Sequence, residues 1–403
     1  MSTHNPEPSA ESGLIVRSGG ALAKLPDGGT PALAEIISRS LVHIQTSKAL
    51  AMRHRIGEHD LCGPDYRLVC ALAEDVRMTP EETLRRLLLT GGIGYEHWDT
   101  RIEDGKFKAL RFQKHTLPIT SLPFVADLVV EILCMGLYEG FVRLDLSVFP
   151  NLRGLACYDS QLTELDLSAV PNLTKLSCHD NQLTELDLSE SLNLTELYCY
   201  KNQLTELDLS QVRNLTVLGC NENQLTELDL SSVPNLTKLL CYQNQLTDLD
   251  LSEVPNLTLL GCYNNQLAEL VLFDVPKLTV LSCYENQLTE LDLSRVPNLA
   301  LLDCHCNQLK ELDISQVPNL TELGCHTNQL TELDLSHAPN LTGLSCKKNQ
   351  LTELDLSQVT KLTVLSCSEN QLTELDIRPL KILSALFYDK GKTMLIQRPD
   401  QNF

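Results

Sequence analysis

Residues 236–256 read LTKLLCYQNQLTDLDLSEVPN, and close variants of this unit recur every 21 residues along the second half of the chain. A cysteine marks the period, at Cys157, Cys178, Cys199, Cys220, Cys241, Cys262, Cys283, Cys304, Cys325, Cys346 and Cys367. From Asn181 to Asn370, an asparagine stands three residues after the cysteine of its unit. A fixed period of this length predicts a solenoid, in which short coils bury their apolar faces only against neighbouring coils.

The charge of the chain is strongly negative, with a formal net charge of −21, and nearly all of it falls on the repeats. Phosphate binding requires a basic surface, so this composition argues against nucleic acid as a partner of the repeats. No apolar stretch of the sequence is long enough to span a bilayer. We therefore expect a protein partner, for which a basic surface is one alternative, and no membrane span.

The chain has 15 cysteines, of which 11 are the repeat cysteines. Their strict spacing at a position that otherwise suits leucine predicts small buried thiols rather than disulfides. Free thiols are typical of a reducing compartment. The polar residues 1–13 do not have the pattern of a secretory signal, so we expect a cytoplasmic protein.

Five segments follow from composition and pattern. We expect a disordered leader at 1–30, a helical N-terminal domain at 31–103, degenerate repeats at 104–148, regular repeats at 149–378, and a C-terminal cap and tail at 379–403. Within the helical domain, apolar spacing predicts one helix from Pro31 to about Ile56. Two further helices begin near Pro64 and at Thr79, where Thr79 serves as N-cap and Pro80 takes the first helical position.

The degenerate coils are placed by analogy with the regular unit. Leu110 to Leu117 fits the repeat with His115 in the asparagine position, and a second irregular coil runs from Ile132 to Leu146 with Cys134 in the cysteine position. At the other end, Tyr388 takes the cysteine position of a closing coil. Atypical end coils cover the apolar cross-sections of a solenoid.

The half-unit LxxLxCxxNxL resembles the conserved segment of leucine-rich repeat proteins, with cysteine as the last apolar residue of the strand. The second half-unit, LTELDLS, imitates the first, and is similar to the short bacterial class in which both halves are strand-like. The resemblance implies an α/β solenoid: a leucine-rich repeat superhelix with a parallel β-sheet ladder, a strand-like second half-repeat and a small helical N-terminal capping domain. The repeats lack the Leu-Pro-x ending that is typical of secreted ubiquitin-ligase effectors, which argues against a ubiquitin-ligase function.

The residue after each cysteine is expected to point outward from the sheet, because side chains alternate along a strand. In this column eight residues carry rings: Tyr158, His179, Tyr200, Tyr242, Tyr263, Tyr284, His305 and His326. Large amphipathic rings dominate binding hot spots, so we predict that these eight residues form the partner-binding site. The alternative is that the rings only stabilise the sheet through cross-strand contacts.

The second half-unit carries two acidic columns. Aspartates recur from Asp145 to Asp376, interrupted at Val271, and glutamates recur from Glu164 to Glu374, with Asp248 in place of one of them. A solvated surface that opposes aggregation is the simplest interpretation. A face for a basic protein, or for calcium, is the alternative.

No catalytic residue, metal site or cofactor is expected. Asp303, His305, Cys306 and His326 have the chemistry of a zinc site, but outward residues of a flat sheet diverge, so we assign no metal to them. In the N-terminal domain, His54 and His59 accompany Cys62 and Cys70 without any recognisable nucleophile motif, and both cysteines are interpreted as core thiols.

The sequence therefore predicts a non-enzymatic scaffold for protein–protein interaction that binds through the ring-bearing face of its sheet. Two alternatives stay open. One is a secreted bacterial effector that targets a host protein, with residues 1–30 as export signal. The other is an enzyme in the N-terminal domain whose substrates are recruited by the repeats.

Overall fold

The computed structural model describes residues 53–56, 59–62, 69, 80, 84, 101–103, 106–113, 132–136, 144, 146, 147, 149–401 and 403. They belong to two compact units, Met1–Leu183 and Thr184–Phe403, which we treat separately. Within the described part of the chain, there is no helix with the length and apolar character needed to cross a membrane.

The first unit contains the strands β1 (Arg53–Ile56), β2 (His59–Cys62), β3 (Arg101–Glu103), β4 (Lys106–Gln113), β5 (Ile132–Gly136), β6 (Gly154–Ala156) and β7 (Lys175–Ser177). β1 and β2 form a separate antiparallel pair. β3 pairs antiparallel with β4, and from β4 to β7 the strands are parallel.

The predicted helix from Pro31 to about Ile56 is wrong at its C-terminal end, because Arg53–Ile56 is strand β1. Its partner β2 begins at His59, so only Gly57 and Glu58 separate the two strands. A two-residue connection with glycine first is typical of a β-hairpin, and this local signal outweighs the apolar spacing. Val69, Pro80 and Leu84 are helical and buried, as predicted for the second and third helices. The leader at 1–30, the rest of the first helix and the ends of the others lie outside the described residues.

The two degenerate coils were predicted with different accuracy. Leu110 in β4 stands opposite Leu133 in β5, so Phe112 takes the cysteine position, as expected for the first coil. In the second coil, Leu133 stands opposite Leu155 and Cys134 opposite Ala156. Cys134 is therefore not in the cysteine position, which belongs to Met135. The sequence match placed it one residue out of register because a cysteine in this region looked like the repeat marker.

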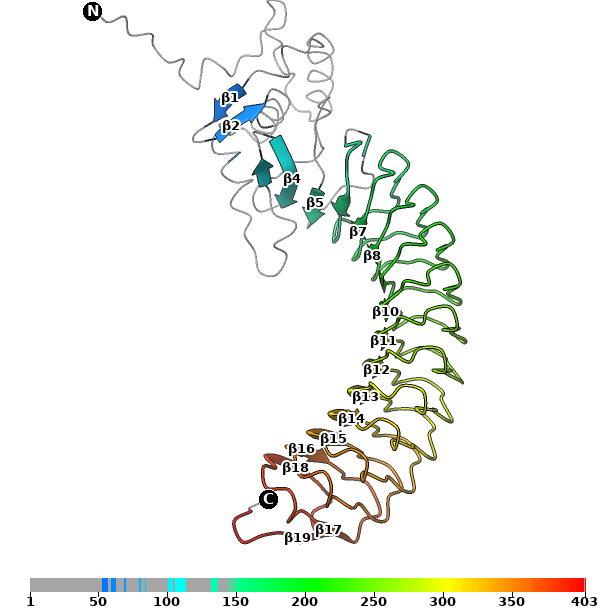
Figure 1. Ribbon diagram of the computed structural model, residues 1–403, viewed down its shortest axis with the longest axis vertical. Helices are drawn as coiled ribbons and strands as arrows, with labels where there is room; N and C mark the ends of the chain where they lie inside the picture. The colour runs from blue at the N-terminus through cyan, green and yellow to red at the C-terminus, as the bar shows by residue number, and fades with distance from the viewer. Residues whose placement is uncertain are drawn as a thin grey trace, which may run out of the picture. The chain divides into compact units, whose positions relative to one another are not determined.

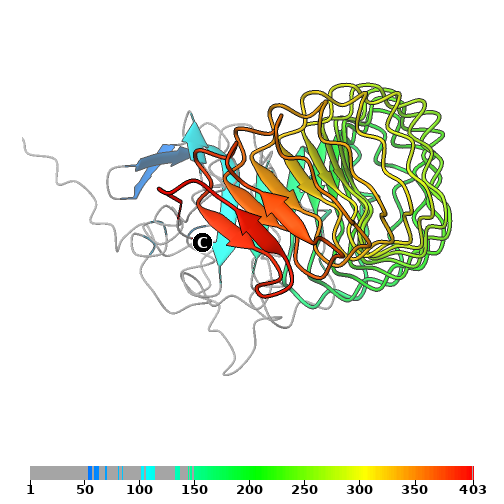
Figure 2. The same ribbon diagram turned by 90° about the horizontal axis from the view of Figure 1, so that it is seen from below.

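The second unit is a stack of coils, each with one three-residue strand on the same side (Figures 1 and 2). These strands are β8 (Glu196–Tyr198), β9 (Val217–Gly219), β10 (Lys238–Leu240), β11 (Leu259–Gly261), β12 (Val280–Ser282), β13 (Leu301–Asp303), β14 (Glu322–Gly324), β15 (Gly343–Ser345), β16 (Val364–Ser366) and β18 (Ala385–Phe387). All are parallel and in register at 21-residue steps. Within this unit the strands line the inner side of the curved stack (Figure 1).

The core of most coils is filled by leucines, one valine and the repeat cysteine, and Ser191 and Ala338 take the valine position in two coils. In the coil of Cys262, for example, Leu257, Leu260, Cys262 and Leu267 have no exposed surface. All 11 repeat cysteines are buried free thiols, which confirms their predicted packing role. Burial raises the pKa of the nine repeat cysteines from Cys199 to Cys367, to about 12 for Cys262, because a thiolate would lose its hydration. These thiols are therefore inert at neutral pH.

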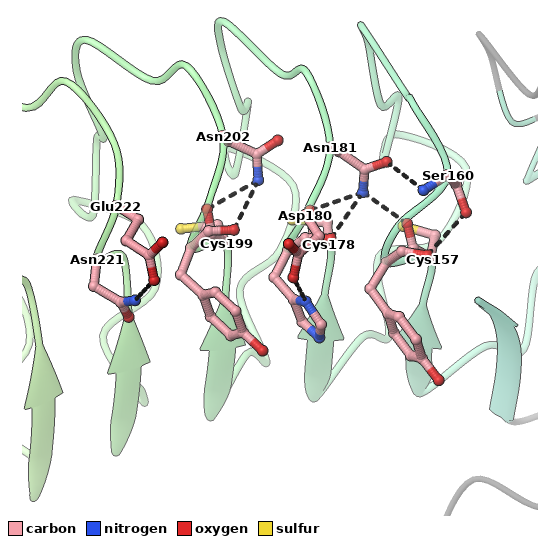
Figure 3. Close-up of polar contacts among 12 residues, drawn as sticks. Cys157, Ser160, Cys178, Asp180, Asn181, Cys199, Asn202, Asn221 and Glu222 are labelled. Atoms are coloured by element: carbon pink, nitrogen blue, oxygen red, sulfur yellow. Dashed lines mark hydrogen bonds and ion pairs between the residues drawn. The ribbon is translucent and has the colours of Figure 1, made fainter. Parts of the chain in front are cut away.

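The repeat asparagine ties neighbouring coils together. Asn265 donates through Nδ2 to the carbonyl oxygens of Cys241 at 3.1 Å and Cys262 at 3.0 Å, and its Oδ1 accepts the N–H of Leu246 at 3.0 Å. Asn181 does the same in the first unit, with Cys157 and Cys178 (Figure 3). Each buried amide thus satisfies backbone groups that would otherwise be buried unpaired, as the sequence predicted.

The second half of the coil differs from the strand-like form that was predicted. Among the residues that the structure describes, the Leu-Asp-Leu half is a hydrogen-bonded strand only at β17 (Glu374–Asp376). Elsewhere its backbone makes local turns, as where Val254 N–H donates to Leu251 O at 3.2 Å. The aspartate closes the same turn, since Asp250 Oδ1 accepts the N–H of Ser252 at 2.9 Å. Such side-chain turns compete with strand pairing.

The C-terminal residues complete the stack. β18 stands in register with β16, with Leu386 opposite Leu365, so Tyr388 follows in the cysteine position as predicted. The tail then forms β19 (Met394–Ile396), which pairs with β17. Gln401 is buried and donates through Nε2 to the carbonyls of Ile377 and Leu380 at 3.0 and 2.9 Å. The tail is thus a structural cap for the last regular coil.

Candidate interaction face: a column of stacked rings

The ring-bearing residues follow directly after the strands, one position beyond the repeat cysteine. Because the coils are in register, rings of successive coils come to lie above one another. Five of them form one continuous stack in the second unit: Tyr242, Tyr263, Tyr284, His305 and His326. Neighbouring ring centroids are 4.1 to 4.2 Å apart, with interplanar angles of 8 to 12°. We call these five residues the ring column.

The structure does not unite all eight predicted binding residues. Tyr158 and His179 stack on each other in the first unit, with centroids 4.8 Å apart. Tyr200 lies in the second unit, but the next coil has Asn221 at the ring position, where it is buried and donates to Glu222 Oε1 at 3.3 Å. The ring column therefore begins at Tyr242.

All five rings are partly buried, because each covers the flat face of its neighbour. Burial raises the pKa of the Tyr242 and Tyr263 phenols to about 12, and in each case the next tyrosine along the column raises it further. The pKa of Tyr284 is raised as well. At neutral pH the column therefore presents uncharged phenols, which act as hydrogen-bond donors and acceptors along its open edge.

The histidine end of the column is polar. His305 Nδ1 lies 2.5 Å from Asp303 Oδ1, and His326 Nδ1 lies 3.3 Å from Ser345 Oγ. The pKa of His326 is lowered, first by burial and then by the neighbouring His305. In the next coil Lys347 takes the ring position and forms an ion pair with Glu369 at 3.0 Å. The column therefore ends at His326.

Large side chains that the sequence analysis did not include also lie on this face. Tyr198 is the last residue of β8, and a Cβ added to Gly219 on the next strand would come within 3.2 Å of its ring. Leu240 at the end of β10 has the same relation to Gly261, at 2.9 Å. A bulky outward residue followed 21 positions later by glycine is a signal that could have identified both.

The acidic columns lie in the second half of each coil, and their aspartates accept hydrogen bonds from the backbone. The aspartates accept the N–H two residues ahead, as Asp208 does from Ser210 at 2.8 Å, and this bond lowers the pKa of Asp208. Val271 breaks the column, and it is exposed together with Phe273, over whose ring the Arg295 guanidinium lies at 4.5 Å. The Asp-x-Ser spacing is itself the signature of such a turn. The predicted roles of these aspartates, a solvated surface or a face for a basic protein or calcium, did not include this turn.

The N-terminal candidates remain open. His54, His59 and Cys62 lie in β1 and β2, and the backbone register pairs Arg53 with Cys62 and Ile56 with His59. Nothing further of their side chains, or of Cys70, lies within the described residues. The expectation that both cysteines are core thiols stays a prediction.

The sequence matches no protein-family model and no curated protein. Solved structures do match. The functional domain of InlJ from Listeria monocytogenes, which includes a cysteine ladder, is 32% identical over 68% of each chain, with a TM-score of 0.60. YopM from Yersinia pestis, a leucine-rich effector protein, is 26% identical over 72% of this chain and 88% of its own, with a TM-score of 0.59. A leucine-rich repeat protein of Leptospira interrogans, 24% identical over 72% of this chain and 84% of its own, has a TM-score of 0.63 and shares the fold.

Proposed function

Because the chain belongs to the leucine-rich repeat family, we propose that it is a non-enzymatic scaffold that binds a protein partner through the ring column. The observation that carries this proposal is the unbroken stack of five rings on the strand side of one unit. An ordered row of tyrosines and histidines offers contact area at little cost in conformational entropy, because stacking already fixes the rings.

The chemistry of the column suits a protein surface. Face-to-face stacking hides the ring faces and leaves edges, phenolic hydroxyls and imidazole nitrogens for a partner. Such groups combine apolar contact with hydrogen bonds, the combination found at binding hot spots. A stack that served only the stability of the sheet would need no polar tips, although it would show the same ring distances.

The acidic half of the coil is less suited to binding a partner than the ring column is. Its aspartates are engaged in turns, and its glutamates, such as Glu290 and Glu311, are exposed. Exposed single charges contribute little affinity but influence association rates and solubility. Docking of a basic partner on this acidic half is the alternative to docking on the ring column, and the scaffold function is the same in both cases.

Affinity purification from the native cells, with partners identified by mass, tests the proposal. The triple variant Tyr242→Ala, Tyr263→Ala, Tyr284→Ala is expected to lose partners that the intact chain retains. The triple Tyr→Phe variant keeps the stack and separates loss of hydroxyls from loss of rings. The matched control is the triple variant Glu290→Gln, Glu311→Gln, Glu332→Gln, which changes the same number of residues on the acidic half of the coil. Retention of every partner by the alanine variant, with loss in the glutamine variant, would move the site to the acidic side.

A second candidate is a secreted effector that acts on a host protein. It is favoured by the likeness to YopM of Yersinia pestis, which is an effector protein. A translocation reporter fused to residues 1–30 separates the two, because a cytoplasmic scaffold leaves the reporter inside the producing cell. Export of the reporter would establish the effector and would leave the ring column as its binding face.

A further inference from the structure

The coil of β13 departs from the repeat at two positions, Asp303 and Cys306, which flank His305. Asp303 is the single acidic residue at the end of the strands β6 to β16 and β18, where other coils have mostly small residues. His305 lies in the ring column, and Cys306 follows it in a position where other coils carry Asp, Asn, Lys, Glu, Gln or Thr. Two departures within four residues, on either side of a histidine, point to a local purpose.

Cys306 has no evident structural purpose of its own. Its position requires a left-handed backbone, with φ of 52°. Asn and Asp side chains stabilise this conformation, whereas a cysteine side chain does not. It is also the one partly exposed cysteine among those whose burial the structure describes. A thiol placed there is available for chemistry, unlike the buried thiols of the repeat.

The side chains of this coil meet a histidine from the next coil. Cys306 Sγ and one ring nitrogen each of His305 and His326 lie within 4.8 Å of one another. The strand pattern of the sequence predicts that these outward residues diverge and form no metal site. The in-register stack, with ring centroids 4.1 Å apart, brings them together instead.

Asp303 sets the orientation of His305. Its Oδ1 lies 2.5 Å from Nδ1, which places the proton on Nδ1 and leaves the lone pair of Nε2 for a ligand. Gly324 makes this arrangement possible, because a Cβ at that position would come within 2.5 Å of Asp303 Oδ1. A carboxylate behind an imidazole is a usual outer partner of a metal-bound histidine.

We propose that His305, Cys306 and His326 bind one zinc-like divalent ion, with Asp303 as the positioning residue for His305. Two imidazoles and one thiolate form a ligand set that suits zinc, and the fourth position stays open to water or to a ligand from a partner. The site does not depend on the proposed function of the ring column.

Binding requires one ring to turn. A metal lies in the plane of each imidazole that it binds, and two stacked rings with an interplanar angle of 11° share no nearby plane. His326 is suited to this movement because it is the last ring of the column and gives up a single stacking contact. Ion binding therefore opens the end of the column between His305 and His326.

Titration of the reduced full-length protein with Co²⁺, followed by competition with Zn²⁺, tests the site. A cysteine thiolate bound to Co²⁺ produces a charge-transfer absorption, which we expect to saturate at one ion per chain and to disappear on addition of Zn²⁺. Cys306→Asn is expected to abolish this band. Asparagine suits the left-handed position, as Asn264 does in another coil, so the variant is expected to keep the fold.

Two more variants complete the design. Asp303→Asn is expected to weaken Co²⁺ binding roughly 10- to 100-fold without removing the band, as loss of an outer partner does. His179→Ala is the matched control, because His179 also stacks on a ring and contacts a carboxylate, Asp180, but the cysteine next to it, Cys178, is a buried repeat cysteine. It is expected to bind Co²⁺ as the intact chain does. An unchanged band in Cys306→Asn, or no thiolate band in the intact chain, would overturn the proposal.

Discussion

Replacement of Asn265 by alanine tests the role of the repeat asparagine quantitatively. The residue is buried, with 9% of its surface exposed. Its amide bonds the carbonyls of two cysteines and one N–H of its own and the preceding coil at 3.0 to 3.1 Å, and it makes a longer bond of 3.4 Å to Tyr263 O. The two carbonyls keep a second donor, since Cys241 O also accepts from Asn244 and Cys262 O from Asn286. The N–H of Leu246 has no other acceptor among the described residues.

The cost follows from this difference. An orphaned buried N–H costs about 1–3 kcal/mol, and each of the two lost bonds to the carbonyls costs about 1 kcal/mol net. The free energy of unfolding should therefore fall by about 3–5 kcal/mol. Asn265→Asp is nearly isosteric but cannot donate to the carbonyls, so we expect it to be at least as destabilising as the alanine variant.

Urea unfolding followed by circular dichroism measures the loss, and native-state hydrogen exchange of the Leu246 amide localises it. Local exchange is needed because coils of a repeat array can unfold without the rest. Asn256→Ala is the control, since Asn256 is half-exposed and donates one bond, to Pro234 O at 3.2 Å. If Asn265→Ala costs no more than Asn256→Ala, the reasoning about buried backbone groups is wrong.

Four other predictions concern single residues of the second unit. Tyr263→Ala removes two ring stacks and should cost about 1–3 kcal/mol beyond the loss of buried area, measured by urea unfolding, whereas a variant at the end of the column loses one. The raised pKa of Tyr263 means that its contribution is intact below pH 10, the ordinary phenol pKa, and is lost as pH rises towards about 12; tyrosinate absorbance and unfolding should change together in that window. The lowered pKa of Asp250 gives the opposite sign, with stability lost as pH falls below about 4, and Asp250→Asn should be less acid-sensitive than the intact chain while Asp250→Ala melts earlier at neutral pH. Peptide mapping after brief alkylation should find Cys306 modified before any repeat cysteine, such as Cys283.

The solenoid was predictable because its signal is repeated. The spacing of leucine, cysteine and asparagine places each residue in the core or at the turn, and Asn265 bonds its neighbouring coils as that spacing indicated. The N-terminal region has no such repetition. There the apolar spacing before Ile56 predicted a helix where a hairpin strand exists, and a single cysteine, Cys134, was taken for the repeat marker.

The candidate sites depended on distances that a sequence does not contain. The sequence identified the ring-bearing positions, but whether the rings stack or stand apart depends on rotamers set by the neighbouring coils. The rejected metal cluster shows the same limit, because an ideal flat sheet separates His305 from Cys306, whereas the left-handed turn at Cys306 does not. The Asp-x-Ser spacing is typical of the turn that these aspartates form, but their negative charge favoured the interpretation as a solvated surface.

The most direct test of partner binding through the ring column is photocross-linking from defined positions. Benzoylphenylalanine in place of Tyr263 should capture the partner, whereas the same group in place of Glu290, on the acidic half of the coil, should not. The ring of the probe can take the place of the tyrosine in the stack, so the fold is preserved. Capture from position 290 and none from position 263 would contradict the account.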